Sequence, residues 1–440
     1  MGTGIGVLFL YNVFLFFAII VGFPLVVPII LTSDKRRRTF LQRLGLAPMP
    51  PGLRRVRFYC SGKKTIWVHA LSVGEVFSAV PLVKKLKDRF SDQGIVVSVS
   101  TKTGFEIANS LFSETVDAVF FYPYDLIFSV RRISAGVDPA IVVIVETDIW
   151  PNFLFDMRKR SVPLILVNAR LSKRSFKGYK RLRFFTLSLF SSFSTICTQS
   201  EADAARFSRL GIPSNRITVT GNFKFDREKD AVPEREMENL RRSMRLDPFQ
   251  KVFLAGSTHD GEEEILCDAF SRLKKECQDM LLVLAPRDPE RAGSISRMFR
   301  AAGFSSVLMK EIEKANVEQR FDVIVVDTIG VLKRLYALAD VAFVGGSLVK
   351  CGGHNPLEPA AYARPILFGP DMSDFAEISE MLLASEGAIR VEDTGSLCRA
   401  VTKIAGDTHV ADRMGNNAFN VFSDNSGAVE KTLKVIESFL

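Results

Sequence analysis

The sequence predicts an α/β protein built from two Rossmann-like domains behind an apolar N-terminal segment. Three observations predict this fold class. The chain has 440 residues, which is more than one hydrophobic core usually holds. Short runs rich in Val, Ile and Leu alternate with helical stretches, as in parallel βαβ units. The pattern restarts after a charged stretch at 226–250. The runs are apolar at nearly every position, which indicates strands covered on both faces.

The first 33 residues contain no charged side chain, and residues 5–31 are almost wholly apolar. A helix of this length can cross about 30 Å of hydrocarbon. The basic run Lys-Arg-Arg-Arg follows at 35–38. Because segments rich in Lys and Arg stay inside, we expect residues 1–33 to be a membrane anchor, with the body on the cytoplasmic face. Pro24 and Pro28 leave a kinked or interfacial segment open, and a buried core helix is the alternative.

Four segments follow from this pattern. We expect an anchor at 1–33, a first Rossmann-like domain at 34–225, a hinge at 226–250 and a second Rossmann-like domain at 251–440. Ligands of open α/β sheets bind at the carboxyl ends of the strands. The candidate strands are 65–69, 95–100, 118–121, 141–145, 164–168, 195–198, 217–220, 252–256, 281–285, 322–326, 341–344 and 366–368.

A net charge of +9 favours anionic partners, namely phospholipid, phosphorylated substrate or nucleic acid. No nucleic-acid-binding motif is visible, so we expect no nucleic-acid partner. A basic cluster at 170–183 precedes Phe184 and Phe185, and such a stretch can lie on inner membrane phospholipid. A solvated basic helix face is the alternative. The six cysteines form no C-x-x-C pair, which argues against a structural zinc site.

Three motifs of the first half place polar residues after strands. Glu75 ends WVHALSVGE near the start of a helix, where the helix dipole favours a carboxylate that could act as a general base. Glu146 opens ETDIWPN directly after a strand, and Lys224 lies in GNFKFD beside the hinge. Helix capping is the alternative interpretation of either glutamate, and a solvated lysine is the default for Lys224.

The second half has its most specific motif at 345–359, GGSLVKCGGHNPLEP. Glycines let a backbone approach a phosphate closely, and a helix N-terminus attracts anions. Glu358, in the first turn, could accept both hydroxyls of a ribose. The motifs AGSTH at 255–259, APR at 285–287 and DTIG at 327–330 each follow a strand, and Arg287 could hold a phosphate.

These motifs together resemble the 3-deoxy-D-manno-octulosonic acid (Kdo) transferase family of lipopolysaccharide assembly. The likeness extends to about Phe375, and its markers are WVHALSVGE, ETDIWPN, NARLSKRSFKGY, TGNFKFD, STHDGEEE, APRDPER, DTIG and GGHNPLEPA. The resemblance implies the GT-B fold, CMP-Kdo as donor, a lipid A precursor (lipid IVA) as acceptor, and inverting transfer that needs neither a metal nor another cofactor. It also implies that the domain at 34–225 binds the acceptor, that the domain at 251–440 binds the nucleotide sugar, and that the protein works at a bacterial inner membrane.

The resemblance also implies residue roles. It assigns Glu75 as the base and Glu146 and Lys224 as groups that stabilise the transition state. Further candidates are Ser257, Gly353, His354 and Arg170. The implied CMP-binding residues are Pro286, Arg287, Ile329, Gly330, Val331, Asn355, Pro356, Leu357 and Glu358. The family usually has an acidic residue where this chain has Val331, a histidine where it has Asp288, and Glu-Leu where it has Asp148-Ile149. The first change puts a side-chain role at Val331 in doubt.

Three other functions remain open at this stage. A GT-B transferase that uses a UDP-sugar keeps the fold and changes the donor. A nucleotide-sugar epimerase of the same architecture would not need the anchor. A basic, membrane-tethered nucleic-acid-binding protein would leave the glycine-rich motif at 345–359 unexplained. The number and linkage of transferred Kdo units do not follow from the sequence.

Overall fold

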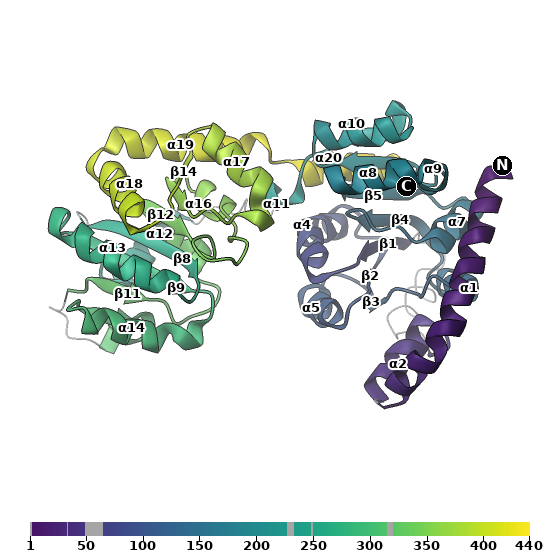
Figure 1. Cartoon of the computed structure of the whole chain (residues 1–440), viewed down its shortest axis with the longest axis horizontal. Coiled ribbons are helices and arrows are strands. Elements are labelled where there is room, and N and C mark those ends of the chain that lie inside the picture. Colours follow the sequence, from purple (N-terminus) through teal and green to yellow (C-terminus); the bar gives the residue numbers. More distant parts are fainter. Residues whose placement is uncertain (1, 33, 49–64, 227–232, 248–249, 315–319) are drawn as a thin grey trace. The chain divides into compact units, whose positions relative to one another are not determined.

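The computed structural model describes residues 2–32, 34–48, 65–226, 233–247, 250–314 and 320–440. The chain divides into two compact units, Met1–Arg227 with Ser426–Leu440, and Glu228–Asn425. In the described parts, each unit contains a seven-stranded sheet with helices packed around it (Figure 1). The prediction of two α/β halves with parallel sheets is therefore confirmed.

The sheet of the first unit has the strand order β3-β2-β1-β4-β5-β6-β7, and its neighbouring strands pair in parallel. Its strands are β1 (Thr65–Ala70), β2 (Gly94–Val99), β3 (Ala118–Phe121), β4 (Pro139–Val145), β5 (Leu164–Ala169), β6 (Thr195–Thr198) and β7 (Ile217–Val219). Its helices are α1 (Gly2–Leu31), α2 (Asp34–Arg43), α4 (Val73–Arg89), α5 (Lys102–Phe112), α6 (Ile127–Val137), α7 (Pro151–Lys159), α8 (Lys173–Arg181), α9 (Arg183–Phe190), α10 (Glu201–Leu210), η1 (Ser214–Arg216), α11 (Phe223–Asp226) and α20 (Ala428–Glu437).

The sheet of the second unit has the order β10-β11-β9-β8-β12-β13-β14 and is also parallel. Its strands are β8 (Lys251–Thr258), β9 (Met280–Pro286), β10 (Ser306–Leu308), β11 (Val323–Val325), β12 (Val341–Val344), β13 (Ile366–Phe368) and β14 (Ala388–Arg390). Its helices are α12 (Glu234–Ser243), α13 (Glu262–Glu276), η2 (Pro289–Arg291), α14 (Ala292–Ala301), η3 (Met309–Lys314), α15 (Leu332–Tyr336), α16 (Leu357–Ala360), η4 (Ser373–Phe375), α17 (Ala376–Ala384), α18 (Thr394–Gly406) and α19 (Thr408–Asp424).

Each sheet buries both of its faces. On β1, Trp67 belongs to one apolar cluster, whereas its neighbours Ile66 and Val68 belong to the cluster on the other face. On β4, Val142 and Val143 divide in the same way. Successive side chains of a strand point to opposite faces, so a run of Val and Ile at every position requires helices on both sides.

The predicted hinge at 226–250 contains a helix that packs into the second unit. Met237 and Leu240 of α12 contact the apolar cluster that also holds Met244 and Val252. Residues 227–232 and 248–249 of the predicted hinge lie outside the described residues. Two edge strands, β10 and β14, were absent from the prediction because each of them, Ser-Val-Leu and Ala-Ile-Arg, contains a polar residue and only two apolar residues in a row.

The last helix corrects the predicted boundary of the second domain, which placed residues 251–440 together. Helix α20 packs with the first unit, where Val429 and Leu433 join the cluster of Leu82 and Val83 from α4. Asp226 fixes the start of α20, because its carboxylate accepts hydrogen bonds from the backbone N–H groups of Gly427 and Val429. The apolar stripe of α20 packs against residues of α4 that lie at least 346 positions earlier in the chain, and sequence periodicity cannot identify such a partner.

Helix α1 lies along the first unit (Figure 1). Its inner edge contacts α7 and α9, and Val7 is buried there. The side chains of Asn12 and Asn152 exchange two hydrogen bonds of 2.8 and 3.0 Å, and the ring of Tyr11 lies beside that of Phe185. Its outer edge is apolar and exposed, and its large side chains there include Phe9, Phe14, Phe16 and Phe17.

Among the residues that the structure describes, no helix combines the length and hydropathy needed to cross a bilayer. The predicted membrane-spanning anchor at 1–33 is therefore not supported. Part of this segment docks on the protein itself through Val7 and Asn12.

We expect Asp226→Ala to detach α20 and to lower the free energy of unfolding of the first unit by about 1–2 kcal/mol, the usual cost of losing a capping carboxylate. Urea unfolding and hydrogen exchange of residues 428–437 measure this. Arg89→Ala is the matched control, because Arg89 binds Glu430 and Glu437 on the exposed side of the same helix, where ion pairs contribute little. Equal losses in the two variants would contradict this role of Asp226.

Candidate functional site

Four of the predicted site residues meet at the carboxyl edge of the first sheet. Glu75 lies in the first turn of α4 after β1, and Glu146 directly follows β4. Arg170 follows β5, and Lys224 lies in the short helix α11 after β7. Glu146 interacts electrostatically with both Lys224 and Arg170, and Glu75 with Glu146. The structure thus brings together side chains that are up to 149 positions apart in the sequence.

The carboxyl of Glu75 is partly buried, and this burial has the largest effect on its pKa. Its carboxylate accepts hydrogen bonds from the backbone N–H of Leu71 at 2.5 Å and from the Ser72 hydroxyl at 3.3 Å. Burial nevertheless raises the pKa of Glu75 to about 7, and the negative charges of Glu146 and Asp148 add to this rise. The sequence predicted that the helix dipole keeps this group ionised. Burial outweighs that effect, so at neutral pH both protonation states are populated.

Glu146 has a strained backbone. Its φ is 62°, in the left-handed region that a residue with a side chain rarely adopts. Burial raises the pKa of its carboxyl, whereas the charges of Lys224 and Arg170 and a hydrogen bond with Ser78 oppose the rise. Strain of this kind is typical of functional sites.

A buried hydrogen-bond network lies next to this cluster and was not predicted as part of the site. Asp148 accepts hydrogen bonds from His69 Nε2 at 2.9 Å and from Trp150 Nε1 at 2.7 Å. The other ring nitrogen of His69 contacts Ser98, which also accepts a hydrogen bond from Trp67 Nε1 at 2.7 Å. The only sequence signal was a histidine in an apolar strand together with an acid in ETDIWPN. The negative charge of Asp148 raises the pKa of Glu75, so this network influences the protonation of the cluster.

The second group of predicted residues lies at the carboxyl ends of the strands of the second unit. Ser257 is in the last part of β8 with a φ of 56°, Pro286 ends β9, and exposed Arg287 follows it. Ile329, Gly330 and Val331 lead into α15, and Ile329 is 84% exposed. Pro356, Leu357 and Glu358 form the start of α16, where the Asn355 side chain accepts a hydrogen bond from the backbone N–H of Leu357.

The loops that precede α15 and α16 lead into helices whose side chains interact. Glu358 interacts electrostatically with the buried Tyr336 of α15, and burial together with this charge raises the pKa of the phenol. Gly353 has a φ of 71°, and a Cβ there would meet Met372. The tight turn therefore requires glycine, as the sequence indicated.

A carboxylate of the protein occupies part of the glycine-rich loop. The loop was predicted to approach a phosphate through its backbone, and three of its N–H groups already have another partner. Buried Glu262, in the first turn of α13, accepts hydrogen bonds from the N–H groups of Gly346, Ser347 and Leu348 at 2.7, 3.0 and 2.9 Å. It also accepts one from the N–H of His259 at 2.9 Å. Glu262 is thus an internal anion for this loop.

His354 pairs with a residue that the sequence did not single out. Its Nε2 lies 2.8 Å from Nε2 of His259, and the two rings are stacked at an angle of 7°. The pKa of His354 is lowered to about 4, chiefly by burial and also by the nearby His259 and Arg287, while Asp374 opposes these effects. His259, Arg287 and His354 follow β8, β9 and β12, three neighbouring strands at the centre of the sheet.

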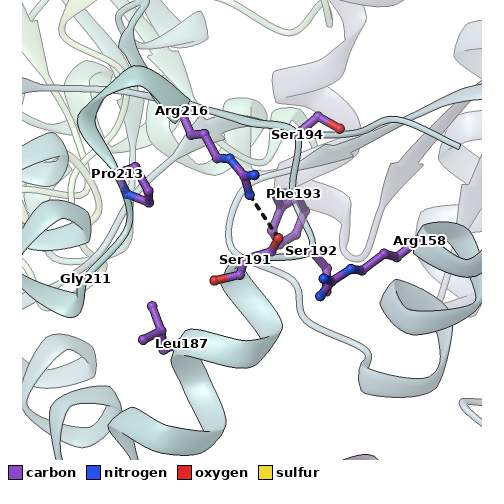
Figure 2. Close-up of a pocket in the computed structure, with 9 residues that line it drawn as sticks. All are labelled: Arg158, Leu187, Ser191, Ser192, Phe193, Ser194, Gly211, Pro213 and Arg216. Carbon is purple, nitrogen blue, oxygen red and sulfur yellow. Dashed lines mark hydrogen bonds between the residues drawn. The ribbon is translucent and has the colours of Figure 1, made fainter. Parts of the chain in front are cut away.

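An open pocket lies at the opposite, amino-terminal edge of the first sheet (Figure 2). Its volume is about 660 Å³, and none of the predicted site residues lines it. Ser194 and Arg216 directly precede β6 and β7. Figure 2 shows Arg216 reaching the carbonyl of Ser191, at 3.2 Å. This arginine caps the C-terminal end of α9, which gives it a structural role.

The family model for 3-deoxy-D-manno-octulosonic-acid transferase (kdotransferase) matches residues 38–227. The chain is 34% identical to the 3-deoxy-D-manno-octulosonic acid transferase of Haemophilus influenzae, over 87% of this chain and 88% of that protein. It is 33% identical to the transferase of the same description from Rickettsia felis, over 86% of this chain and 80% of that protein.

Solved structures share the fold at much lower identity. UDP-GlcNAc 2-epimerase from Neisseria meningitidis has a TM-score of 0.59 and 14% identity, over 86% of this chain and 100% of that one. A glycosyltransferase from Rickettsia africae has a TM-score of 0.52 and 13% identity, over 86% and 99%. At such identities the likeness concerns the fold alone. The relatives that align over most of their length show the family to which the chain belongs. The chain is a member of the 3-deoxy-D-manno-octulosonic acid (Kdo) transferase family.

Proposed function

We propose that the chain is an inverting glycosyltransferase that moves Kdo from CMP-Kdo to the lipid A precursor lipid IVA. The observation that supports this most is the cluster of Glu75, Glu146, Lys224 and Arg170 in a member of the Kdo transferase family. A carboxylate whose pKa is about 7 suits the removal of a proton from a sugar hydroxyl at neutral pH.

In the proposed mechanism, ionised Glu75 takes the proton of the acceptor hydroxyl while the hydroxyl oxygen attacks the anomeric carbon of Kdo. The bond from that carbon to the CMP phosphate breaks in the same displacement, and CMP leaves with the bonding electron pair. Lys224 and Arg170 stabilise the negative charge near Glu146, and Lys224 also stabilises charge that develops in the transition state. No step requires a metal or another cofactor.

A second candidate, a nucleotide-sugar epimerase, is favoured only by the shared fold with the Neisseria meningitidis protein. Product analysis separates the two. We expect the purified protein to attach Kdo to lipid IVA when CMP-Kdo is supplied, with unchanged activity in excess EDTA, as measured by mass spectrometry. Transfer from a UDP-sugar instead, or epimerisation of a UDP-sugar without transfer, would contradict the proposal. A strict need for magnesium would contradict its metal-free mechanism.

We expect Glu75→Gln to lower the transfer rate by roughly 100-fold or more and, at pH 8, to raise the melting temperature. Burying the ionised carboxyl destabilises the folded protein, and the amide removes that cost. The stability difference should be largest above pH 7, shrink as the folded protein takes up a proton near pH 7, and vanish below about pH 4.5, where Glu75 is protonated in both states.

The matched control is Glu106→Gln, because Glu106 lies on α5 of the same unit and its side chain, which pairs with Lys102 at 3.7 Å, is 58% exposed. It should change neither rate nor stability. In the wild type, kcat/KM should decline below pH 7 as Glu75 becomes protonated. A flat profile between pH 5 and 8, or normal turnover by folded Glu75→Gln, would exclude Glu75 as the base.

We also propose that the first unit attaches to inner membrane phospholipid from the cytoplasmic side. The support is the exposed apolar edge of α1, together with Leu182 and Phe184, which are 63% and 64% exposed beside the basic helix α8. The exposed bases of α8 are Lys173, Arg174, Lys177, Lys180 and Arg181. Such a surface combines apolar insertion with attraction to anionic headgroups.

Replacing Phe9, Phe14 and Phe17 by Ser should release most of the protein from phosphatidylglycerol-containing vesicles in a flotation assay, since each buried Phe contributes about 1.5 kcal/mol or more. The control is Phe419→Ser, on an exposed position of the second unit. Added salt should weaken the remaining attachment by screening α8. Attachment that is unchanged by the substitutions and by salt would contradict a membrane role for this surface.

A further inference from the structure

The segment ETDIWPN at 146–152 connects β4 to α7 and contains two of the charges that act on Glu75, those of Glu146 and Asp148. The hydrogen bonds that Asp148 accepts hold the segment from the side of the sheet. Asn152, the last residue of the segment, is held from elsewhere. It is 3% exposed, and its partners include a residue of α1. The helix α1 therefore takes part in holding this segment.

The contact with α1 is a reciprocal pair of side-chain amides. Asn12 Nδ2 donates to Asn152 Oδ1 at 2.8 Å, and Asn152 Nδ2 donates to Asn12 Oδ1 at 3.0 Å. The second N–H of Asn12 bonds to the carbonyl oxygen of Leu8, and that of Asn152 bonds to the carbonyl oxygen of Asp125. Each amide of the pair is thus fully hydrogen-bonded. Removing either side chain leaves buried polar atoms of the other without a partner, which is costly.

A second polar contact of α1 acts at the same place. Asp125 accepts hydrogen bonds from the backbone N–H groups of Asn152 and Phe153, at 3.0 and 2.9 Å, and so caps the first turn of α7. The side chain of Tyr11 also hydrogen-bonds with Asp125. Burial raises the pKa of Asp125 to about 6, although these three hydrogen bonds oppose the rise. The carboxylate is therefore mostly ionised at neutral pH and can accept all three.

The polar residues also determine which edge of α1 faces the protein. Asn12 is the only residue at 2–31 with an amide or a charge in its side chain. An amide is costly to place in hydrocarbon, so its pairing with Asn152 fixes the rotation of the helix. The docked positions lie in the first half of α1, whereas residues 16–21 are exposed. The same helix can therefore dock on the protein and keep its outer edge for the membrane.

We propose that Asn12 and Tyr11 are positioning residues for the site of the first unit, so that α1 is part of the transferase machinery and not an anchor alone. They act through the start of α7 on the segment at 146–152. This inference rests on the proposed function, which supplies the reaction. It requires α1 to stay docked while its outer edge lies on the membrane, because withdrawing α1 into a bilayer would break both contacts.

A spectroscopic test does not depend on the reaction. The chain contains two tryptophans, so the ¹⁵N spectrum of the full-length protein has one indole signal each from Trp67 and Trp150, and Trp150→Phe assigns them. Trp150 lies two positions before Asn152 and donates to Asp148 at 2.7 Å, so its signal reports the position of the segment. We expect Asn12→Ala to shift the Trp150 signal and to leave that of Trp67 unchanged.

The kinetic test uses lipid IVA dispersed in detergent, so that attachment to a membrane does not limit the rate. Asn12→Ala should lower kcat by roughly 10-fold, because a misplaced segment slows the reaction. KM for CMP-Kdo should stay the same, because the residues expected to bind CMP lie in the second unit. Tyr11→Phe keeps the ring beside Phe185 and removes only the hydroxyl, so it is a milder variant that should act in the same direction.

The matched control is Leu10→Ala, since Leu10 is 66% exposed on α1, and it should change neither readout. A wild-type Trp150 signal and a wild-type kcat in folded Asn12→Ala and Tyr11→Phe would overturn the inference. A shifted signal with an unchanged kcat would also overturn it, because the contact would then position nothing that the reaction needs.

Failure of the proposed function would look different. If the wild type transfers no Kdo, that proposal is wrong, and the indole signals alone test the positioning. A shift confined to Trp150 in the two variants supports it, and identical spectra of variants and wild type overturn it.

Discussion

Each unit has a glutamate, buried fully or in part, near the carboxyl ends of its parallel strands, and the hydrogen bonds that this glutamate accepts determine whether it stays ionised. A buried carboxylate must find donors or lose its charge. Glu262 has four backbone donors and serves as a fixed internal anion. Glu75 accepts one backbone hydrogen bond and one longer hydrogen bond from Ser72, so burial raises its pKa to about 7. The same residue type, at equivalent places in two similar sheets, becomes an anchor in one unit and a candidate base in the other.

The position of Lys224 depends on a second strained strand end. Asn168, near the end of β5, has a φ of 52°, and its side chain accepts a hydrogen bond from the backbone N–H of Phe223 at 3.1 Å. This contact fixes the start of α11, the helix that contains Lys224. Glu146 and Ser257 have similar backbone strain at the ends of β4 and β8. Packing on both faces of each sheet holds these conformations, so the cores contribute to the geometry of the sites.

The strands were predictable because a run of Val, Ile and Leu that is buried on both faces has a local signature. β3, β6, β12 and β13 have the bounds that the sequence indicated. The strands β10 and β14 were not predictable, because each has only two apolar residues in a row, whereas all three residues of β13 are apolar. The placement of α20 was not predictable either, because its amphipathic pattern fits the first sheet and the second equally well. Only the tertiary contacts of Asp226 and Val429 decide between them.

The site was predictable as a set of residues, but its charge states were not. The sequence identified Glu75, Glu146 and Lys224, and the structure places them together. It gave no sign that Glu262 binds the glycine-rich loop, because a glutamate in the first turn of a helix is common and three of its four partners lie more than 80 residues away. His259 was overlooked for the same reason, since its partner His354 is 95 positions distant.

The central claim is that burial keeps the carboxyl of Glu75 half protonated at neutral pH. The most direct test is a titration of the carboxyl carbon of Glu75 by NMR in the full-length protein labelled with ¹³C at glutamate carboxyls, with Glu75→Gln used to assign the signal. The structure predicts a midpoint at about pH 7. A midpoint near the ordinary value of 4.5 would contradict it, because the carboxyl would then be ionised throughout the neutral range and burial would not govern the site.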